Sequence, residues 1–207
     1  GTGSSQAITG LGFAPNLVWV KQRGGTTWHN IQDTINGATK HLYTNASNTQ
    51  DTTADGLTSF DSDGFTLGGG NGFNGSSQSM VAWAWKADDN EPTINTDGSS
   101  NSIVSVNSNA GFSIVSYVGN QTAGHTIGHG LSVKPDMIII KCLNVARPWY
   151  VYHVGVDASN PSHYNLRLNE TDARQDSTTE FNDTEPTSTV FTLGTASGPN
   201  GSGDNYI

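Results

Sequence analysis

The segment that decides the fold is Phe65-Thr66-Leu67-Gly68, followed at a fixed spacing by Gly72-Phe73-Asn74-Gly75-Ser76, because the same pattern occurs twice in the chain. Phe191-Thr192-Leu193-Gly194 is followed by Gly198-Pro199-Asn200-Gly201-Ser202, at a constant offset of 126 residues. Self-similarity at a fixed distance is typical of a repeated structural module. We therefore predict two related domains.

A second match lies upstream, where residues 11–21 align with residues 131–141 at an offset of 120. Loop insertions between shared strands would produce the drift between the two offsets. Each repeat spans roughly 90 to 115 residues, enough to bury a modest core without metals or disulfides. We place the first domain at 1–87, an acidic linker at 88–100 and the second domain at 101–207.

The two repeats differ at their ends. The second contains a strand-like segment at 111–118 with no counterpart in the first, and it stops at Tyr206-Ile207, which correspond to Met80 and Val81. We therefore expect the first domain to lack its first strand and the second to have a truncated last strand. We also expect these residues to be a segment of a longer chain.

Short runs of alternating apolar, β-branched and aromatic residues predict strands joined by polar turns. Asp61-Ser62-Asp63-Gly64 predicts a tight hairpin turn, and residues 33–42 are expected to hold the only helical turn. Without helical crossovers, the pattern favours an all-β fold of two tandem antiparallel β-sandwiches, jelly-roll or concanavalin-like. We expect strands at residues 17–22, 28–31, 57–60, 65–67, 80–86, 102–106, 111–118, 137–142, 149–154, 164–168, 190–193 and 206–207.

Composition narrows the class of partner. The net charge of −9 and the lack of a basic cluster argue against nucleic acid as a partner, since phosphate contacts need clustered Lys or Arg. No apolar run approaches the roughly 18 residues that span a bilayer, so no membrane insertion is expected. Cys142 ends an apolar run and is expected to be a buried thiol.

The chain offers little evidence for metal binding or catalysis. Asp61 and Asp63 resemble half of a calcium loop, but the later acidic ligand is missing, so we favour a turn and keep weak calcium binding as an alternative. His125 and His129 lie close in sequence but in a glycine-broken stretch. No nucleophile elbow, phosphate loop or zinc-protease motif occurs, and we expect no cofactor and no enzyme activity.

Aromatic side chains on a polar sheet protein suggest a glycan platform. The apolar face of a sugar stacks on Trp or Tyr, while Asn and Asp bind its hydroxyls. The competing interpretation is that these aromatics bridge sheets or line a subunit interface. The candidates for glycan contact are Trp28, Tyr43, Trp149, Tyr150 and Tyr152.

Three segments of the first repeat, at 11–21, 58–68 and 80–86, together resemble a repeated module of tail-fibre-like and other virion surface proteins of tailed bacteriophages, especially marine ones. The second repeat adds similar segments at 111–119 and 186–194. The resemblance covers nearly the whole chain apart from the linker. It implies β-sandwich modules in series on a virion exterior, often likened to concanavalin-type lectin domains, and it supplies no catalytic residues.

From the resemblance we expect a non-enzymatic virion structural protein, a fibre or spike component that displays β-sandwich modules for recognition of a host-surface glycan. A capsid decoration or stabilising protein and a glycan depolymerase remain as alternatives. The expected partners are other virion proteins, further copies of the same chain in a homo-oligomer, and the glycan. The expected location is the virion exterior, after assembly in the cytoplasm of a bacterial host.

Overall fold

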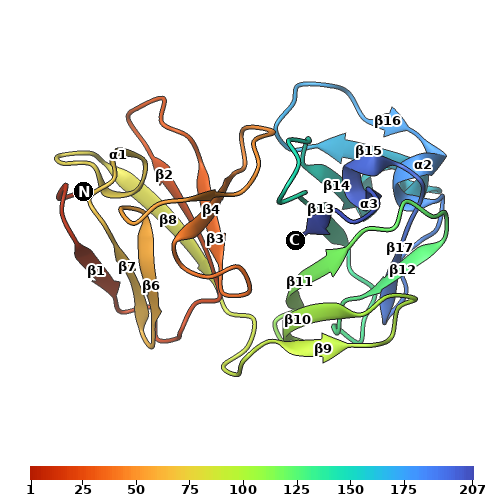
Figure 1. Ribbon diagram of the computed structural model, residues 1–207, viewed down its shortest axis with the longest axis horizontal. Coiled ribbons are helices and arrows are strands. Elements are labelled where there is room, and N and C mark those ends of the chain that lie inside the picture. Colours follow the sequence, from red (N-terminus) through yellow and green to blue (C-terminus); the bar gives the residue numbers. More distant parts are fainter. The chain divides into compact units, whose positions relative to one another are not determined.

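The computed structural model describes residues 1–207, and its architecture is all-β. Eighteen strands form several sheets, and every pairing between named strands is antiparallel. The chain divides into two compact units (Figure 1). Unit 1 comprises residues 1–45 and 50–90, and unit 2 comprises residues 46–49 and 91–207.

Unit 1 contains two sheets and one short helix, α1 (Asn71–Asn74). The first sheet has the order β1 (Gln6–Thr9), β7 (Gly64–Leu67), β6 (Leu57–Asp61). The second has the order β5 (Asp51–Thr52), β4 (Lys40–Tyr43), β3 (Asn30–Asp33), β2 (Leu17–Gln22), β8 (Met80–Trp85).

The core of unit 1 follows from the two-residue period of a strand. On β2, Val18 and Val20 are fully buried, whereas Trp19 between them is only partly covered. The buried valines belong to one cluster with residues of the other sheet and of α1, each worth about 1.5–3 kcal/mol when fully buried. The remaining buried members of the cluster are Leu57, Phe65, Leu67 and Phe73.

Unit 2 contains three sheets. They have the orders β18 (Asn205–Tyr206), β11 (Phe112–Val118), β10 (Ser102–Asn107), β9 (Thr93–Asn95); β12 (His125–Gly128), β17 (Val190–Leu193); and β13 (Met137–Ile140), β14 (Tyr150–His153), β15 (Tyr164–Arg167), β16 (Gln175–Asp176). Its helical elements are η1 (Val154–Val156), η2 (Pro161–His163), α2 (Thr178–Phe181) and α3 (Ser197–Asn200).

The core of unit 2 draws on all three of its sheets and is rich in tyrosine. Tyr152 and Tyr206 are fully buried, and the Tyr206 ring stacks on Tyr117 with centroids 5.0 Å apart. Cys142 is also fully buried, as expected from the sequence. Ile127, Ile140, Tyr150, Phe181, Phe191 and Leu193 complete the cluster.

Strand pairings recur between the units at the offsets found in the sequence. The β2–β3 register repeats in β13–β14 at an offset of 120 residues. The residues of β17 follow those of β7 at an offset of 126. The carbonyl of Asn74 accepts from Gly3 N as that of Asn200 accepts from Gln121 N. The register pairs that carry the comparison are Leu17↔Asp33 and Val20↔Asn30 in unit 1, and Met137↔His153 and Ile140↔Tyr150 in unit 2.

The helical prediction was wrong. Residues 33–42 contain the last residue of β3, turns and most of β4, and the α-helices lie elsewhere, in α1, α2 and α3. Each of these helices has four residues, too few to show a 3.6-residue period in the sequence. No helix in the structure is long and apolar enough to cross a membrane.

The predicted hairpin at Asp61-Ser62-Asp63-Gly64 is confirmed, but its glycine has a different role. Asp61 pairs with Gly64 across a two-residue turn. Gly64 does not have a positive φ; it is needed because a Cβ there would lie 1.8 Å from the carbonyl oxygen of Ile8 on β1. The close approach of β1 therefore requires the glycine.

The division between the units falls at Asn90–Glu91, inside the segment expected to be a linker. Part of that segment is ordered in a sheet, because β9 (Thr93–Asn95) pairs with β10. The strands expected at 102–106 and 111–118 are confirmed as β10 and β11, which form a hairpin and pair in register from Ile103↔Ser116 to Asn107↔Phe112.

Candidate functional site

Two of the five aromatic candidates meet in unit 1. The Trp28 and Tyr43 rings have centroids 4.3 Å apart and planes at 81°, an edge-to-face contact. Trp28 lies in the loop before β3, and Tyr43 lies at the end of β4, opposite Asn30 in the sheet. Trp28 keeps 42% of its surface exposed, so the pair presents an aromatic surface to solvent.

The loop that carries Trp28 is tied down at both ends. At its start, the Lys21 ammonium donates to the carbonyls of Gln22 and Gly25, at 2.6 and 2.9 Å. At its end, the backbone N–H of His29 donates to Asn45 Oδ1 at 2.9 Å. The strand-to-strand connection is therefore held by side chains that compensate for its lack of regular pairing.

A pocket of about 310 Å³ opens beside the aromatic pair. Its residues come from three places in the sequence, the loop before β3, the β3–β4 sheet and α1, which the fold of unit 1 brings together. Most of this lining is apolar or aromatic, as in sites that bind a small ligand. The lining residues are Thr27, Trp28, Asn30, Tyr43, Gly72 and Phe73.

Asn30 gives the pocket a polar point with a fixed orientation. Its amide nitrogen donates to the carbonyls of Trp28 and Gly72, at 3.3 and 3.0 Å, which leaves Oδ1 as the free acceptor. The side chain is 2% exposed, and Oδ1 has no hydrogen-bond partner within the protein. A buried acceptor without a partner costs free energy, so a donor that reaches this oxygen would be favoured.

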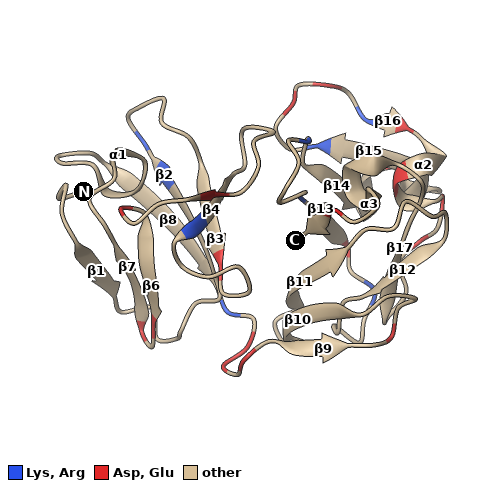
Figure 2. Cartoon of the chain, in the orientation of Figure 1, with Lys and Arg blue, Asp and Glu red and all other residues tan.

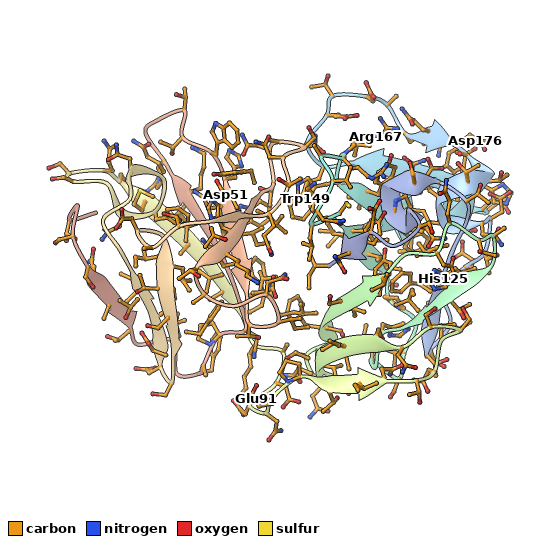
Figure 3. All side chains as sticks on the ribbon, viewed as in Figure 1. Asp51, Glu91, His125, Trp149, Arg167 and Asp176 are labelled. Atoms are coloured by element: carbon orange, nitrogen blue, oxygen red, sulfur yellow. The ribbon has the colours of Figure 1, made fainter.

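The hydroxyl of Tyr43 belongs to a row of polar side chains. The Tyr43 hydroxyl lies 2.9 Å from His41 Nε2 and donates to Asp51 at 3.4 Å. Burial lowers the pKa of His41, partly opposed by Asp51, and burial together with Asp51 raises the pKa of Tyr43. Both rings are therefore held in their neutral forms. Asp51 lies on β5, at the edge of the sheet (Figure 3).

The other three aromatic candidates lie in unit 2 and are not presented to solvent. Trp149, Tyr150 and Tyr152 are 4%, 8% and 0% exposed. The Trp149 indole N–H donates to the carbonyl of Ala46, and the Tyr152 hydroxyl donates to Glu185 at 2.6 Å. Burial and the Glu185 carboxylate raise the pKa of Tyr152. In this structure these rings pack inside the unit and offer no face for sugar stacking.

The calcium candidates already have partners within unit 1. Asp61 accepts from the hydroxyls of Ser59 and Thr66, both at 2.8 Å. Asp63 accepts from the backbone N–H groups of Gly10 and Gly12, at 3.0 and 2.6 Å. The two carboxylates thus fasten the hairpin and the loop after β1. No group of three or more His, Cys, Asp or Glu residues is placed to hold a metal ion.

The residue types of this pocket suit recognition of a neutral, partly apolar ligand. Lys and Arg are few and lie on separate elements of each unit (Figure 2), and none lines the pocket. Sequence reasoning identified Trp28 and Tyr43 but missed Asn30, Gly72 and Phe73. The repeat could have pointed to Gly72 and Phe73, which belong to the segment that occurs twice, but not to Asn30, which lies outside it.

Comparisons with known proteins give a family and nothing on activity. No curated protein and no solved structure matches the chain. The family model described as "Domain of unknown function (DUF7483)" matches residues 1–207. The chain therefore belongs to the DUF7483 family.

Proposed function

We propose that the protein is a structural component of a bacteriophage virion, a fibre or spike element, in which the pocket of unit 1 binds a glycan of the host surface. The observation that carries the glycan part is the pocket itself. An exposed Trp28 edge-to-face with Tyr43 supplies apolar surface for a sugar ring, and Asn30 in the pocket lining carries a buried Oδ1 that has no partner within the protein.

The virion part of the proposal draws on the sequence resemblance and on the repeated pairings. We propose that the two units are copies of one β-sandwich module, in which opposed sheets share a core and turns carry the variable residues. Modules in series multiply weak contacts into avidity. The low charge and the sheet-rich build suit a protein that must assemble in many copies without disulfides.

The proposal is tested on an array of bacterial surface oligosaccharides, followed by titration calorimetry with the oligosaccharide that is retained. Trp28→Ala should weaken binding by roughly tenfold, the equivalent of about 1.4 kcal/mol. Trp83→Ala is the matched control, because Trp83 is similarly exposed, at 47%, but lies on β8 outside the pocket. Equal losses in the two variants, or no retained oligosaccharide, would contradict the proposal.

A second variant tests the pocket without removing an aromatic ring. Asn30→Tyr places in unit 1 the side chain that unit 2 carries at the corresponding register position, Tyr150. We expect this ring to fill the pocket and abolish binding while Trp28 remains. Retained affinity in a folded Asn30→Tyr protein would show that the ligand binds elsewhere.

A further inference from the structure

Unit 2 contains a buried histidine whose two ring nitrogens both have side-chain partners. His125, at the start of β12, is 2% exposed (labelled in Figure 3). Its Nδ1 lies 2.8 Å from Asn200 Oδ1, and its Nε2 lies 2.9 Å from Ser100 Oγ. These three residues come from the segment between β9 and β10, from β12 and from α3, and the fold brings them into one line.

The hydrogen bonds of Asn200 fix which imidazole nitrogen carries the proton. Its Nδ2 donates to the carbonyls of Gly194 and Thr122, at 2.6 and 3.2 Å, so Oδ1 must be the atom that faces His125. An amide oxygen only accepts, and therefore His125 Nδ1 is the donor. The Nε2 lone pair is then left to accept from the Ser100 hydroxyl, the orientation a general base needs to activate a serine.

We infer that Ser100, His125 and Asn200 form a nucleophilic site that cleaves carboxylic esters with good leaving groups. Ser100 Oγ attacks the carbonyl carbon as its proton passes to His125 Nε2. The leaving alcohol takes that proton when its bond to the carbonyl breaks. Water then attacks the acyl-serine, gives a proton to His125, and releases the acid as Ser100 regains its proton. Asn200 holds the imidazole in one tautomer throughout.

Exposure distinguishes Ser100 from the two serines of β10 that follow it. Ser100 is partly exposed, whereas Ser102 and Ser105 on β10 are each 1% exposed and the Ser102 hydroxyl is committed to the carbonyl of Gly128. Ser100 lies outside the named strands, joined to Ile127 by a single parallel bridge. The serine that faces His125 is therefore not fully closed off from solvent.

Unit 1 has the same scaffold without the histidine. Asn74 occupies the position of Asn200: its Nδ2 donates to Gly68 O and its Oδ1 accepts from Thr2 N, as Asn200 does with Gly194 and Asn120. On β1, Gln6 pairs with Leu67, whereas on β12 the residue that pairs with Leu193 is His125. The asparagine is thus common to both units, and the base and nucleophile occur in unit 2 alone.

A fluorophosphonate reagent tests the inference on the whole chain, because it reacts with activated serines. Ser100 Oγ bonds to phosphorus, the P–F bond breaks, and the serine proton passes through His125 to solvent with the fluoride. We expect one adduct per chain, mapped to Ser100 by peptide mass spectrometry. Ser100→Ala should abolish it, and His125→Gln should slow it by at least about 100-fold. The control Ser99→Ala, next in the chain, should keep the wild-type rate.

Release of p-nitrophenolate from p-nitrophenyl acetate gives the second readout, with Ser100→Ala lowering the rate to that of the uncatalysed reaction. Amide hydrogen exchange of β12 and β17 shows that each variant keeps its fold. A folded wild-type chain that forms no adduct, an adduct on another residue, or equal labelling in Ser100→Ala would each overturn the inference. None of these outcomes bears on glycan binding in unit 1.

Discussion

Asn30 in unit 1 and Tyr150 in unit 2 occupy the same place in the strand register, yet one leaves a pocket and the other fills it. Asn30 contacts Gly72, and a Cβ at that glycine would lie 3.0 Å from the Asn30 amide nitrogen. A Cβ at Gly198, which follows Gly72 by the repeat offset of 126, would lie 2.3 Å from the Tyr150 ring. In both units, therefore, the side chain at this register position lies close to a glycine of the repeated segment. The units differ in that side chain, which is asparagine in unit 1 and tyrosine in unit 2.

The two units also differ in the side chains that surround this position. Unit 1 surrounds the space with Trp28 and Tyr43, whereas unit 2 covers its filled position with Arg167, which lies over the Tyr150 ring at 5.4 Å. The same register position thus has different surroundings in the two units. In unit 1 it borders open space beside aromatic rings, and in unit 2 it belongs to the packed core.

The largest expected change in the free energy of unfolding comes from giving each unit the residue of the other, with Tyr150→Asn in unit 2 and Asn30→Tyr in unit 1. Tyr150→Asn removes a buried ring from unit 2 and should cost about 3–5 kcal/mol, as for other large-to-small core substitutions. Asn30→Tyr should cost less, because the ring can occupy the open space of the pocket and the loss is confined to the hydrogen bonds from Asn30 to the carbonyls of Trp28 and Gly72. Denaturant unfolding, followed by amide signals of each unit in NMR spectra, measures both. A loss below about 1 kcal/mol for Tyr150→Asn would show that the ring is not needed for packing.

Asn74→Ala and Asn200→Ala probe what the units share, with an intermediate effect. Both side chains are at most 1% exposed, and each forms hydrogen bonds with buried backbone groups. Leaving such groups without a partner should lower the free energy of unfolding by about 1–3 kcal/mol. Unit 2 should lose more, because His125 also loses its acceptor. Thermal unfolding of the two variants gives the comparison, and a larger loss in unit 1 would contradict it.

Acid titration should give the smallest effect, with opposite signs in the two units. Partial burial acts to raise the pKa of Glu185, but hydrogen bonds from Lys134, Tyr152 and Ser162 outweigh it and lower this pKa to about 2. The stabilisation from this ionised carboxylate is present above its unfolded pKa of about 4.3. It should be lost from unit 2 as the pH falls from there toward about 2.

In unit 1, burial raises the pKa of Asp33 despite hydrogen bonds from Asn36. The stability that this group confers is therefore present when it is protonated, and it declines as the pH rises from about 4. Unit-resolved hydrogen exchange between pH 2 and 6 measures both trends. Glu185→Gln and Asp33→Asn should each flatten the response of their own unit only, and a parallel response of both units would refute the assignment.

Much of the fold is predictable from sequence because strand periodicity is local. Leu17–Gln22 alternates large side chains over six residues, and the structure has β2 at those bounds. Gln6–Thr9 and His125–Gly128 escaped prediction, since each contains only one large apolar residue. Their strand character comes from pairing with the repeated β7 and β17 segments, which is a tertiary effect.

The candidate site was predictable only in residue type. Aromatic identity suggested Trp28 and Tyr43, but the same reasoning selected Trp149, Tyr150 and Tyr152, whose rings point into unit 2. Which face a side chain takes depends on the opposing sheet, and nothing within a few residues of Tyr150 encodes it.

Cys142 has a practical consequence for separating the behaviour of the two units. It is the sole cysteine of the chain, and it is fully buried in the core of unit 2. A maleimide dye can couple to this sulfur only while that core is open, whereas unit 1 has no thiol to couple. The rate of dye coupling therefore reports the opening of unit 2 alone, and no substitution is needed to measure it.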